Sequence, residues 1–161
     1  MSAASASWSF TEDDYRTITR LLQKFLFESN ARCALLVDRS GQLVATVGEK
    51  PRFDATAFAT LTAADFSAND QLAKLIGEKD FSSLFHQGDK ESMYLADIAR
   101  RVILVVLFDT RTTLGLVRLK IKDTVNQLSR QFESMFARAA HASTASGVLA
   151  GAEDEIDKLF S

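Results

Sequence analysis

The residue types that perform chemistry in enzymes are sparse in this chain and do not cluster. His86 and His141 are the two histidines, and neither has a His or Cys partner three or four residues away. The phosphate-binding patterns GxxxxGK[ST] and GxGxxG are absent, and so are the catalytic or metal-binding patterns GxSxG, HExxH and CxxC. The sequence therefore predicts no active site, no metal and no cofactor, and His86 is expected to be an ordinary strand residue.

Charged residues offer two further kinds of chemistry. The acidic clusters at 12–14 and 153–155 each begin a helical pattern, where carboxylates are stabilised by the helix dipole. An arginine in a turn can instead enter the active site of another protein and stabilise the charge that develops in phosphoryl transfer. Five arginines lie in expected turns or connections, and the adjacent pair projects best: Arg39, Arg52, Arg100, Arg101 and Arg111. Most exposed arginines only raise solubility, so none is assigned this role.

Composition limits the class of protein. A chain of 161 residues forms one domain that buries about 70% of its unfolded surface, so it needs neither disulfides nor metal to fold. The net charge of −2 predicts no attraction to nucleic acid or anionic lipid. Cys33 is the only cysteine and lies in an apolar run, which indicates a core residue in a reducing compartment. Residues 1–10 lack the features of a signal peptide, and no run of 18 apolar residues occurs, so we expect a soluble, cytoplasmic protein without membrane insertion.

The elements that could position these residues alternate between helical and strand patterns. A helix begins at Thr11 and runs to about Ser29 with apolar residues three and four apart. Residues 33–37 are apolar throughout, which predicts a strand covered on both faces, and a turn at 38–41 leads into a returning strand at 43–47. The next helix begins after the N-cap Asp54 and ends at Gly77, with a possible break between 67 and 70.

Three strands and a helix complete the chain. Residues 81–87 alternate, 92–98 form another strand, and the seven apolar residues 102–108 predict a central strand. A helix capped by Asp109 or Thr110 then reaches about residue 140. The Ser, Thr, Ala and Gly of 141–152 favour a flexible linker. The predicted order is α-β-β-α-β-β-β-α, with the two fully apolar strands in mid-sheet.

This order and four segments resemble the Roadblock/dynein light chain family, in particular its bacterial members that regulate Ras-like GTPases. The segments are LVDRSGQL at 36–43, LAKLIGE at 72–78, FDTRTTLGLVRL at 108–119 and DEIDKLF at 154–160. The resemblance covers residues 11–161. It implies an α/β (α+β) fold, a five-stranded antiparallel sheet with the first and third helices on one face and the second on the other. We expect a disordered arm at 1–10, the Roadblock domain at 11–140, a linker at 141–152 and a docking motif at 153–161.

The resemblance also implies a homodimer, in which the edge strand at 81–87 pairs with its two-fold mate. The expected interface residues are Phe81, Ser83, Leu84 and Phe85. An apolar edge strand is an aggregation risk when it is alone, and pairing removes that risk.

In the family, the two copies of the second helix form a platform that holds one Ras-like small GTPase per dimer. We expect one apolar stripe of this helix to pack on the sheet: Phe58, Leu61, Ala68, Leu72 and Leu75. The GTPase-binding candidates are small or polar: Ala63, Ala64, Ser67, Ala68 and Gln71. Phe66 adds an apolar group that this arrangement leaves without a role.

The end of the chain is a second candidate contact with the GTPase. Ile156, Leu159 and Phe160 have the i, i+3, i+4 spacing of one helical face. The alternative is a frayed end that packs on its own domain.

The resemblance thus implies a regulator that stimulates GTP hydrolysis by positioning the GTPase's own catalytic residues, in bacterial cell polarity or motility and at a cell pole. The alternative is a non-catalytic Roadblock scaffold that binds a GTPase or other Roadblock proteins without activating hydrolysis. The bulkier or polar residues in the middle of the second helix favour this alternative: Phe66, Ser67, Asn69, Asp70 and Gln71. A small-molecule sensor has little support, because no polar cluster lies in an apolar setting.

Overall fold

The computed structural model describes the backbone of residues 11–160 and the side chains of residues 11–142. The arm predicted at 1–10 lies outside the described residues. Eight elements follow the predicted order: α1 (Glu12–Ser29), β1 (Cys33–Asp38), β2 (Leu43–Gly48), α2 (Ala55–Leu75), β3 (Ser83–His86), β4 (Ser92–Ile98), β5 (Val102–Phe108) and α3 (Leu114–Phe160).

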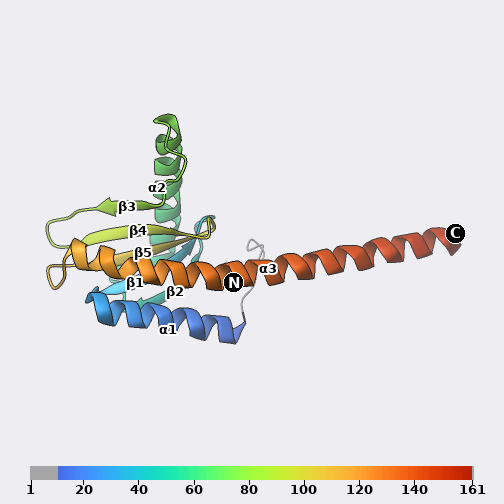
Figure 1. The fold of residues 1–161 in the computed structure, drawn as a ribbon, viewed down its shortest axis with the longest axis horizontal. Helices are drawn as coiled ribbons and strands as arrows, with labels where there is room; N and C mark the ends of the chain where they lie inside the picture. The colour runs from blue at the N-terminus through green and yellow to red at the C-terminus, as the bar shows by residue number, and fades with distance from the viewer. Residues whose placement is uncertain (1–10, 161) are drawn as a thin grey trace.

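The strands form one antiparallel sheet in the order β2-β1-β5-β4-β3 (Figure 1). The fully apolar strands β1 and β5 lie side by side inside it, as predicted, because a strand covered on both faces needs apolar residues at every position. β3 forms one edge of the sheet, which agrees with the prediction of an edge strand.

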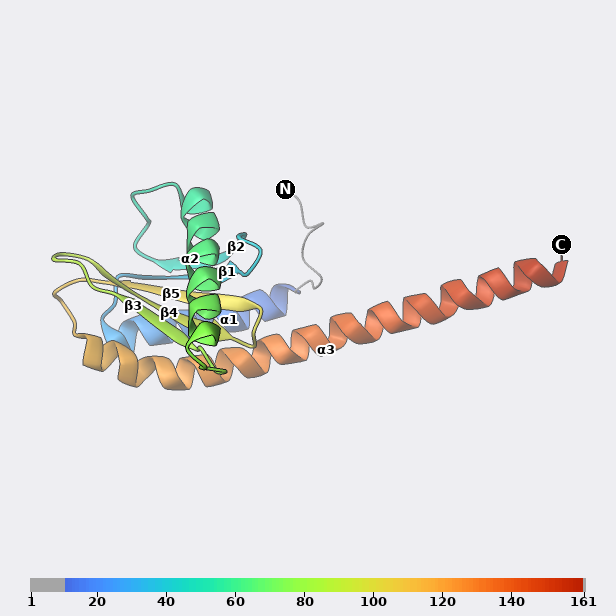
Figure 2. The ribbon, with the colours of Figure 1, turned by 90° about the horizontal axis from the view of Figure 1, so that it is seen from above.

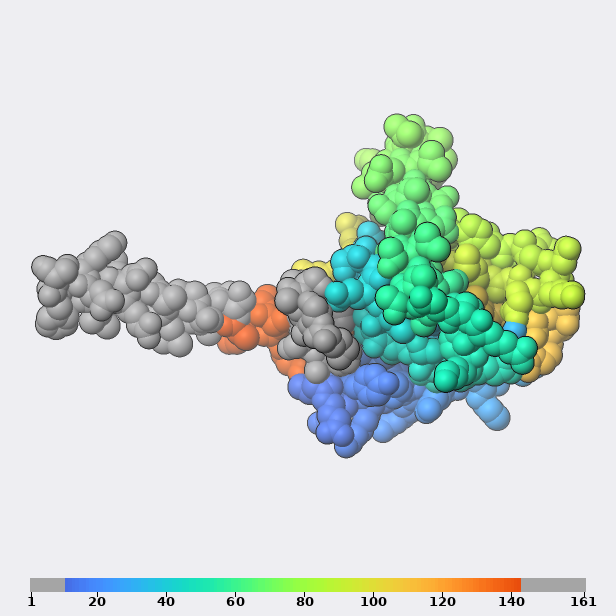
Figure 3. All heavy atoms as spheres, turned by 180° about the vertical axis from the view of Figure 1, so that it is seen from behind, coloured from blue at the N-terminus to red at the C-terminus, as the bar shows by residue number. Residues whose placement is uncertain are grey.

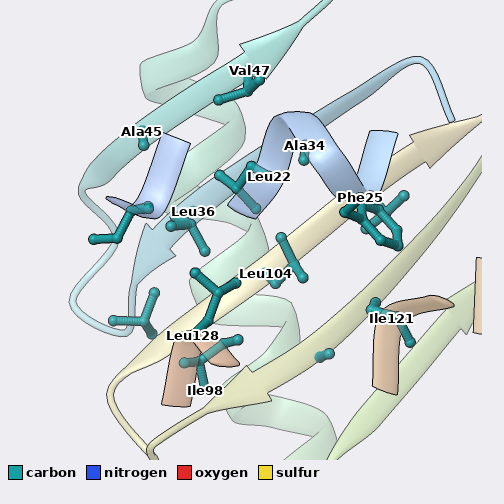
Figure 4. Packing of buried hydrophobic residues seen from close by; sticks show 14 of the residues in the cluster. Leu22, Phe25, Ala34, Leu36, Ala45, Val47, Ile98, Leu104, Ile121 and Leu128 are labelled. Carbon is teal, nitrogen blue, oxygen red and sulfur yellow. The ribbon is translucent and has the colours of Figure 1, made fainter. Parts of the chain in front are cut away.

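Helices cover the two faces as expected. α1 and α3 pack on one face, where Leu36 and Leu104 of the sheet meet Leu22, Phe25 and Leu128 of the helices (Figure 4). α2 packs on the other face, over the strand side chains that point the opposite way, such as Leu35, Ile103 and Val105. Each central strand therefore contributes to two cores.

A buried carboxylate joins α1 to α3. Thr11 and Asp14 form a capping box at the start of α1. The same Asp14 side chain accepts hydrogen bonds from Gln131 at 2.8 Å and from Arg138 at 2.6 Å. Burial opposes ionisation of this carboxyl, but the hydrogen bonds from Arg138 and Thr11 outweigh it and hold the pKa of Asp14 below its ordinary value. The negative charge of Asp14 therefore fixes the first helix to the last.

The last helix begins later and ends later than predicted. It starts at Leu114, where Thr113 Oγ1 accepts the N–H of Leu116. Its helical backbone then continues through 141–152 to Phe160, so the linker prediction was wrong for the backbone there. Four of those twelve residues are alanine, the best helix former, and they offset the cost of Gly147 and Gly151. At 47 residues, α3 is about 70 Å long and projects well beyond the sheet (Figures 1 and 2). No helix in the described part of the chain is long and apolar enough to cross a membrane.

Candidate functional site: the outer face of α2 and the β3 edge

Local sequence signals determine where α2 begins. The Asp54 carboxylate accepts the N–H groups of Thr56 and Ala57 at 3.0 and 3.3 Å, and the rings of Phe53 and Phe58 lie 4.7 Å apart as a hydrophobic staple. The helix is continuous through 67–70, where a break was possible. It therefore presents one uninterrupted surface to each side.

The face of α2 that packs on the sheet differs from the predicted stripe, of which only Phe58 packs against the core. Its buried residues are mostly small, with one large ring: Ala59, Thr62, Ala63, Phe66 and Ala73. Phe66 is 1% exposed and its ring lies 5.0 Å from that of Phe81, while the Arg39 guanidinium covers it at 5.4 Å. The alanines let the helix lie close to the sheet, and Phe66 fills the remaining space. Phe66, for which the sequence predicted no role, is therefore a core residue.

The larger aliphatic residues of α2 point to solvent instead. Leu61, Leu72 and Leu75 are 69%, 58% and 83% exposed, so the prediction that they pack on the sheet was wrong. We call the exposed apolar line on this helix the outer stripe: Leu61, Ala64, Ala68, Leu72, Leu75 and the following Ile76. In Figures 1 and 3 the C-terminal turns of α2 stand beyond β3. A contiguous exposed apolar surface of this kind is typical of a protein–protein interface.

The structure brings most of the predicted binding residues of α2 together. Ala64, Ser67, Ala68 and Gln71 are exposed on or beside the outer stripe. Ala63 is buried among the residues that face the sheet, so it is not on the outer surface. The candidates Ile156, Leu159 and Phe160 lie in the helical backbone of α3, and their side chains are outside the described part of the chain.

The side chains of the predicted dimer strand are mostly used within the molecule. Phe81 and Leu84 pack partly into the core beneath α2. Phe85 packs on the opposite face, with its ring stacked 6.1 Å from Phe108. Ser83 is exposed. The apolar side chains of β3 that suggested an aggregation risk are thus partly buried within the molecule. The unpaired groups of this edge are the backbone N–H and C=O groups.

The pairing of β3 with β4 shows which backbone groups are open. The N–H of Asp97 donates to the C=O of Ser82 at 2.9 Å, and Leu84 lies opposite Leu95. In an antiparallel ladder, alternate residues point their N–H and C=O groups toward the same neighbour. Ser83 and Phe85 therefore direct theirs to the free edge.

A side-chain contact that the sequence did not indicate joins this edge to α2. His86 Nε2 lies 2.8 Å from Asp65 Oδ2, and Asn69 donates to Asp65 Oδ1 at 2.9 Å. His86 is thus more than an ordinary strand residue. The two are 21 positions apart, and no local pattern relates them.

Three of the five turn arginines are held by neighbours, and a fourth, Arg100, has only a long contact on the exposed surface. Arg39 is bound by Asp97, Arg100 lies 3.9 Å from Asp80, and the Arg101 guanidinium lies 4.5 Å from the centre of the Phe136 ring. Arg111 bonds Glu49 and Asp109 at 3.0 Å. Hydrogen bonds from Arg32 and Arg111 lower the pKa of Glu49, and those from Arg111 lower the pKa of Asp109.

The fifth arginine lines a pocket beside the start of α2. Arg52 has no ion pair with any residue that the structure describes. The pocket has a volume of about 420 Å³ and an apolar lining that includes Cys33, Phe53, Phe58 and Leu107. Burial raises the pKa of the Cys33 thiol to about 11, which agrees with its predicted place in the core.

Comparisons with known proteins agree with this architecture. Residues 17–108, more than half of the chain, match the family model of the Roadblock/LC7 domain. MglB from Myxococcus xanthus has a similar structure, with 44% identity, a TM-score of 0.70, and coverage of 73% of this chain and 95% of that chain. The gliding protein MglB from Thermus thermophilus is similar at 32% identity and a TM-score of 0.75, over 81% of this chain and 99% of that chain.

A structure described as MglB with a tetrameric arrangement is also similar, at 32% identity and a TM-score of 0.76, over 82% of this chain and 99% of that chain. No curated protein sequence matches. The five-stranded sheet, the arrangement of its helices and the match over 17–108 lead to one conclusion: the chain belongs to the Roadblock/LC7 family and is similar to the MglB proteins within it.

Proposed function

We propose that this protein is a homodimeric regulator of a Ras-like GTPase of the MglA type, which stimulates GTP hydrolysis in the control of bacterial cell polarity or motility. It acts in the cytoplasm, at a cell pole. The observation that carries the proposal is the exposed outer stripe of α2, which lies next to the free edge of β3. The similarity to MglB supports it.

The dimer forms through the backbone of β3. A two-fold axis near Leu84 places Ser83 of one copy opposite Phe85 of the other, and each pair exchanges N–H and C=O groups that otherwise face solvent. α2 packs beside this strand, because Asp65 contacts His86 at its end and Phe66 contacts Phe81 just before its start. The two outer stripes therefore come together at the axis as one apolar surface.

One GTPase binds across that surface. A single GTPase molecule that lies on the two-fold axis of the dimer covers both outer stripes. A second GTPase then has no room to bind, which gives one GTPase per dimer. Ala64, Ser67 and Ala68 are small and let the partner's backbone approach. The tail residues Ile156, Leu159 and Phe160 supply a second contact at the far end of α3.

The protein stimulates hydrolysis by holding the GTPase's own catalytic residues in place. Three of its turn arginines, Arg39, Arg101 and Arg111, already bind carboxylates or a ring of their own domain, and insertion of any of them would break those contacts. Positioning alone accounts for large rate effects in phosphoryl transfer.

Single-turnover GTP hydrolysis by the cognate GTPase tests this function. We expect saturating protein to raise the rate, and Leu72→Asp in the outer stripe to remove the increase. The matched control is Leu119→Asp, because Leu119 is 63% exposed on α3, away from the stripe. If the unmodified protein does not raise the rate of GTP hydrolysis, the proposal is wrong. Loss of stimulation on Arg101→Ala or Arg52→Ala alone would contradict only the mechanism without an arginine finger.

The dimer has a separate test. Ser83→Pro removes an N–H that faces the free edge and leaves the bonds between β3 and β4 in place. At low protein concentration, we expect light scattering to show a mass near 17.8 kDa for this variant and twice that value for the unmodified chain. An unchanged dimer would place the interface elsewhere.

A non-catalytic scaffold is the second candidate. The polar residues Ser67 and Gln71 beside the stripe favour it, because they suit binding without a specific activating fit. Pull-down with GTP-loaded and GDP-loaded GTPase separates the two, since an activator prefers the GTP form and a scaffold retains both. Truncation after Ala140 keeps the dimer in either case, and it weakens GTPase binding if the tail is a contact.

A further inference from the structure

A groove lies between α3 and the strands β3 and β4, on the face of the sheet opposite α2. Its volume is about 490 Å³. Tyr94, Ala96, Ile121 and Val125 give it an apolar floor, and Arg118 and Lys122 add two cations. Ser82 and Ser83 also line it, so the partner strand of the proposed dimer borders the groove.

The groove carries uncompensated positive charge. Neither Arg118 nor Lys122 forms an ion pair with a carboxylate of the described residues, and the Arg118 guanidinium lies 5.9 Å above the ring of Tyr94. The one acidic residue in the lining, Asp97, is already bound by Arg39. An apolar floor between unpaired cations suits an amphipathic segment that carries carboxylates.

The end of this chain has that chemistry. Residues 153–160 read EDEIDKLF, with four carboxylates and one lysine around Ile156, Leu159 and Phe160. The three apolar residues have the spacing of one helical face, and the backbone there is helical. The segment is therefore complementary to the groove in charge and in its apolar content.

The segment cannot reach the groove of its own molecule. Val125 of the groove and Ile156 of the segment belong to the same unbroken helix and are about 46 Å apart along it. Figures 1 and 2 show that α3 carries its end away from the sheet. The occupant must come from a second molecule.

We propose that residues 153–160 of one molecule dock in the groove of a second molecule, with their carboxylates against Arg118 and Lys122. Reciprocal docking closes a symmetric assembly larger than the β3 dimer, whereas docking in one direction builds chains. The same segment is a GTPase contact in the proposed function, so assembly and GTPase binding compete for it. Docking itself needs no GTPase.

Sedimentation velocity of the full-length protein over a series of concentrations, without GTPase, tests this docking. We expect the unmodified protein to associate beyond the dimer and to do so less at high salt, which screens the charges. Lys122→Glu in the groove and Asp157→Lys in the segment should each weaken this association about tenfold, because each turns an attraction into a repulsion. The double variant should recover it. Lys50→Glu, at an exposed lysine outside the groove, is the control and should change nothing.

Three results would overturn the proposal: no association beyond the dimer, association unchanged by Lys122→Glu, or a double variant as weak as the single ones. A fluorescent peptide of residues 150–161 gives an independent measurement. It should bind the full-length protein and lose affinity on Lys122→Glu, and a peptide that does not bind would contradict the docking. The sedimentation and peptide experiments contain no GTPase. They therefore test the docking independently of the proposed stimulation of GTP hydrolysis.

Discussion

Substitution of Phe66 should damage the fold far more than substitution of Leu75, although both are large apolar residues of the same helix. Phe66 is 1% exposed, whereas Leu75 is 83% exposed. Phe66→Ala removes a buried ring that contacts Phe81 and leaves a cavity, which costs about 3–5 kcal/mol. Leu75→Ala removes a side chain that lies mostly in water and should cost at most about 0.5 kcal/mol within one molecule.

Thermal unfolding followed by circular dichroism measures both effects. For a chain of this size, 1 kcal/mol corresponds to about 2–4 °C in Tm. Phe66→Ala should therefore lower Tm by about 6–20 °C, and Leu75→Ala by no more than about 2 °C. The scan is repeated at several protein concentrations, because self-association adds stability that depends on concentration. The loss from Phe66→Ala should be the same at low and high concentration.

One result would refute this orientation of α2. If Leu75→Ala lowers Tm as much as Phe66→Ala does at the lowest concentration, Leu75 packs within the molecule and the outer stripe does not exist. A loss on Leu75→Ala that appears only at high concentration instead supports burial of the stripe between copies.

Three further predictions concern the core and the turns. The pKa of Asp14 is lower in the folded protein than the unfolded value near 3.9, so the stability that this carboxylate contributes is present above that value and is lost as pH falls through the folded pKa. Asp14→Asn should therefore lower the free energy of unfolding at neutral pH, and it should reduce the loss of stability that the unmodified protein shows below about pH 4. Urea titrations at several pH values measure both effects. Gly48 has φ +101° and a Cβ there would lie 2.5 Å from the Arg32 carbonyl oxygen, so Gly48→Ala should cost more in thermal scans than Gly77→Ala, where φ is +89° and the space is open. The buried Cys33 thiol, with a pKa of about 11, should not react with a thiol reagent at pH 8 until urea unfolds the protein.

Much of the fold is determined by short-range patterns. The apolar runs of β1 and β5 predict their places inside the sheet, because only a doubly covered strand tolerates apolar side chains on both faces. Asp54 and the Phe53–Phe58 pair mark the start of α2, because these contacts form within one turn. The edge position of β3 was implied by the family resemblance, and its alternating pattern is consistent with a place outside the two apolar strands.

The orientation of α2 is decided only in three dimensions. This helix has apolar residues on both sides, so its periodicity predicts two faces that could be buried. The face with the larger side chains is the one that the sequence favours for burial. The folded protein buries the smaller one, and the turn at Gly41 lies against it: a Cβ on Gly41 would be in van der Waals contact with Thr60 and Ala63. Small side chains are needed at that contact, and the leucines are left outside.

The same distinction applies to the candidate site. The sequence correctly predicted Ala64, Ser67 and Gln71 on the outer surface, since small and polar residues are often exposed. It placed Ala63 there as well, and it assigned the exposed Ala68 to both faces. The contact of His86 with Asp65 and the groove between α3 and the sheet could not be predicted, because their residues lie far apart in the chain. The sequence by itself determined the elements, their order and their caps, all of which rest on contacts within a few residues. The tertiary structure decided which faces are buried and which remain open to partners, because that choice depends on how closely separate elements can pack.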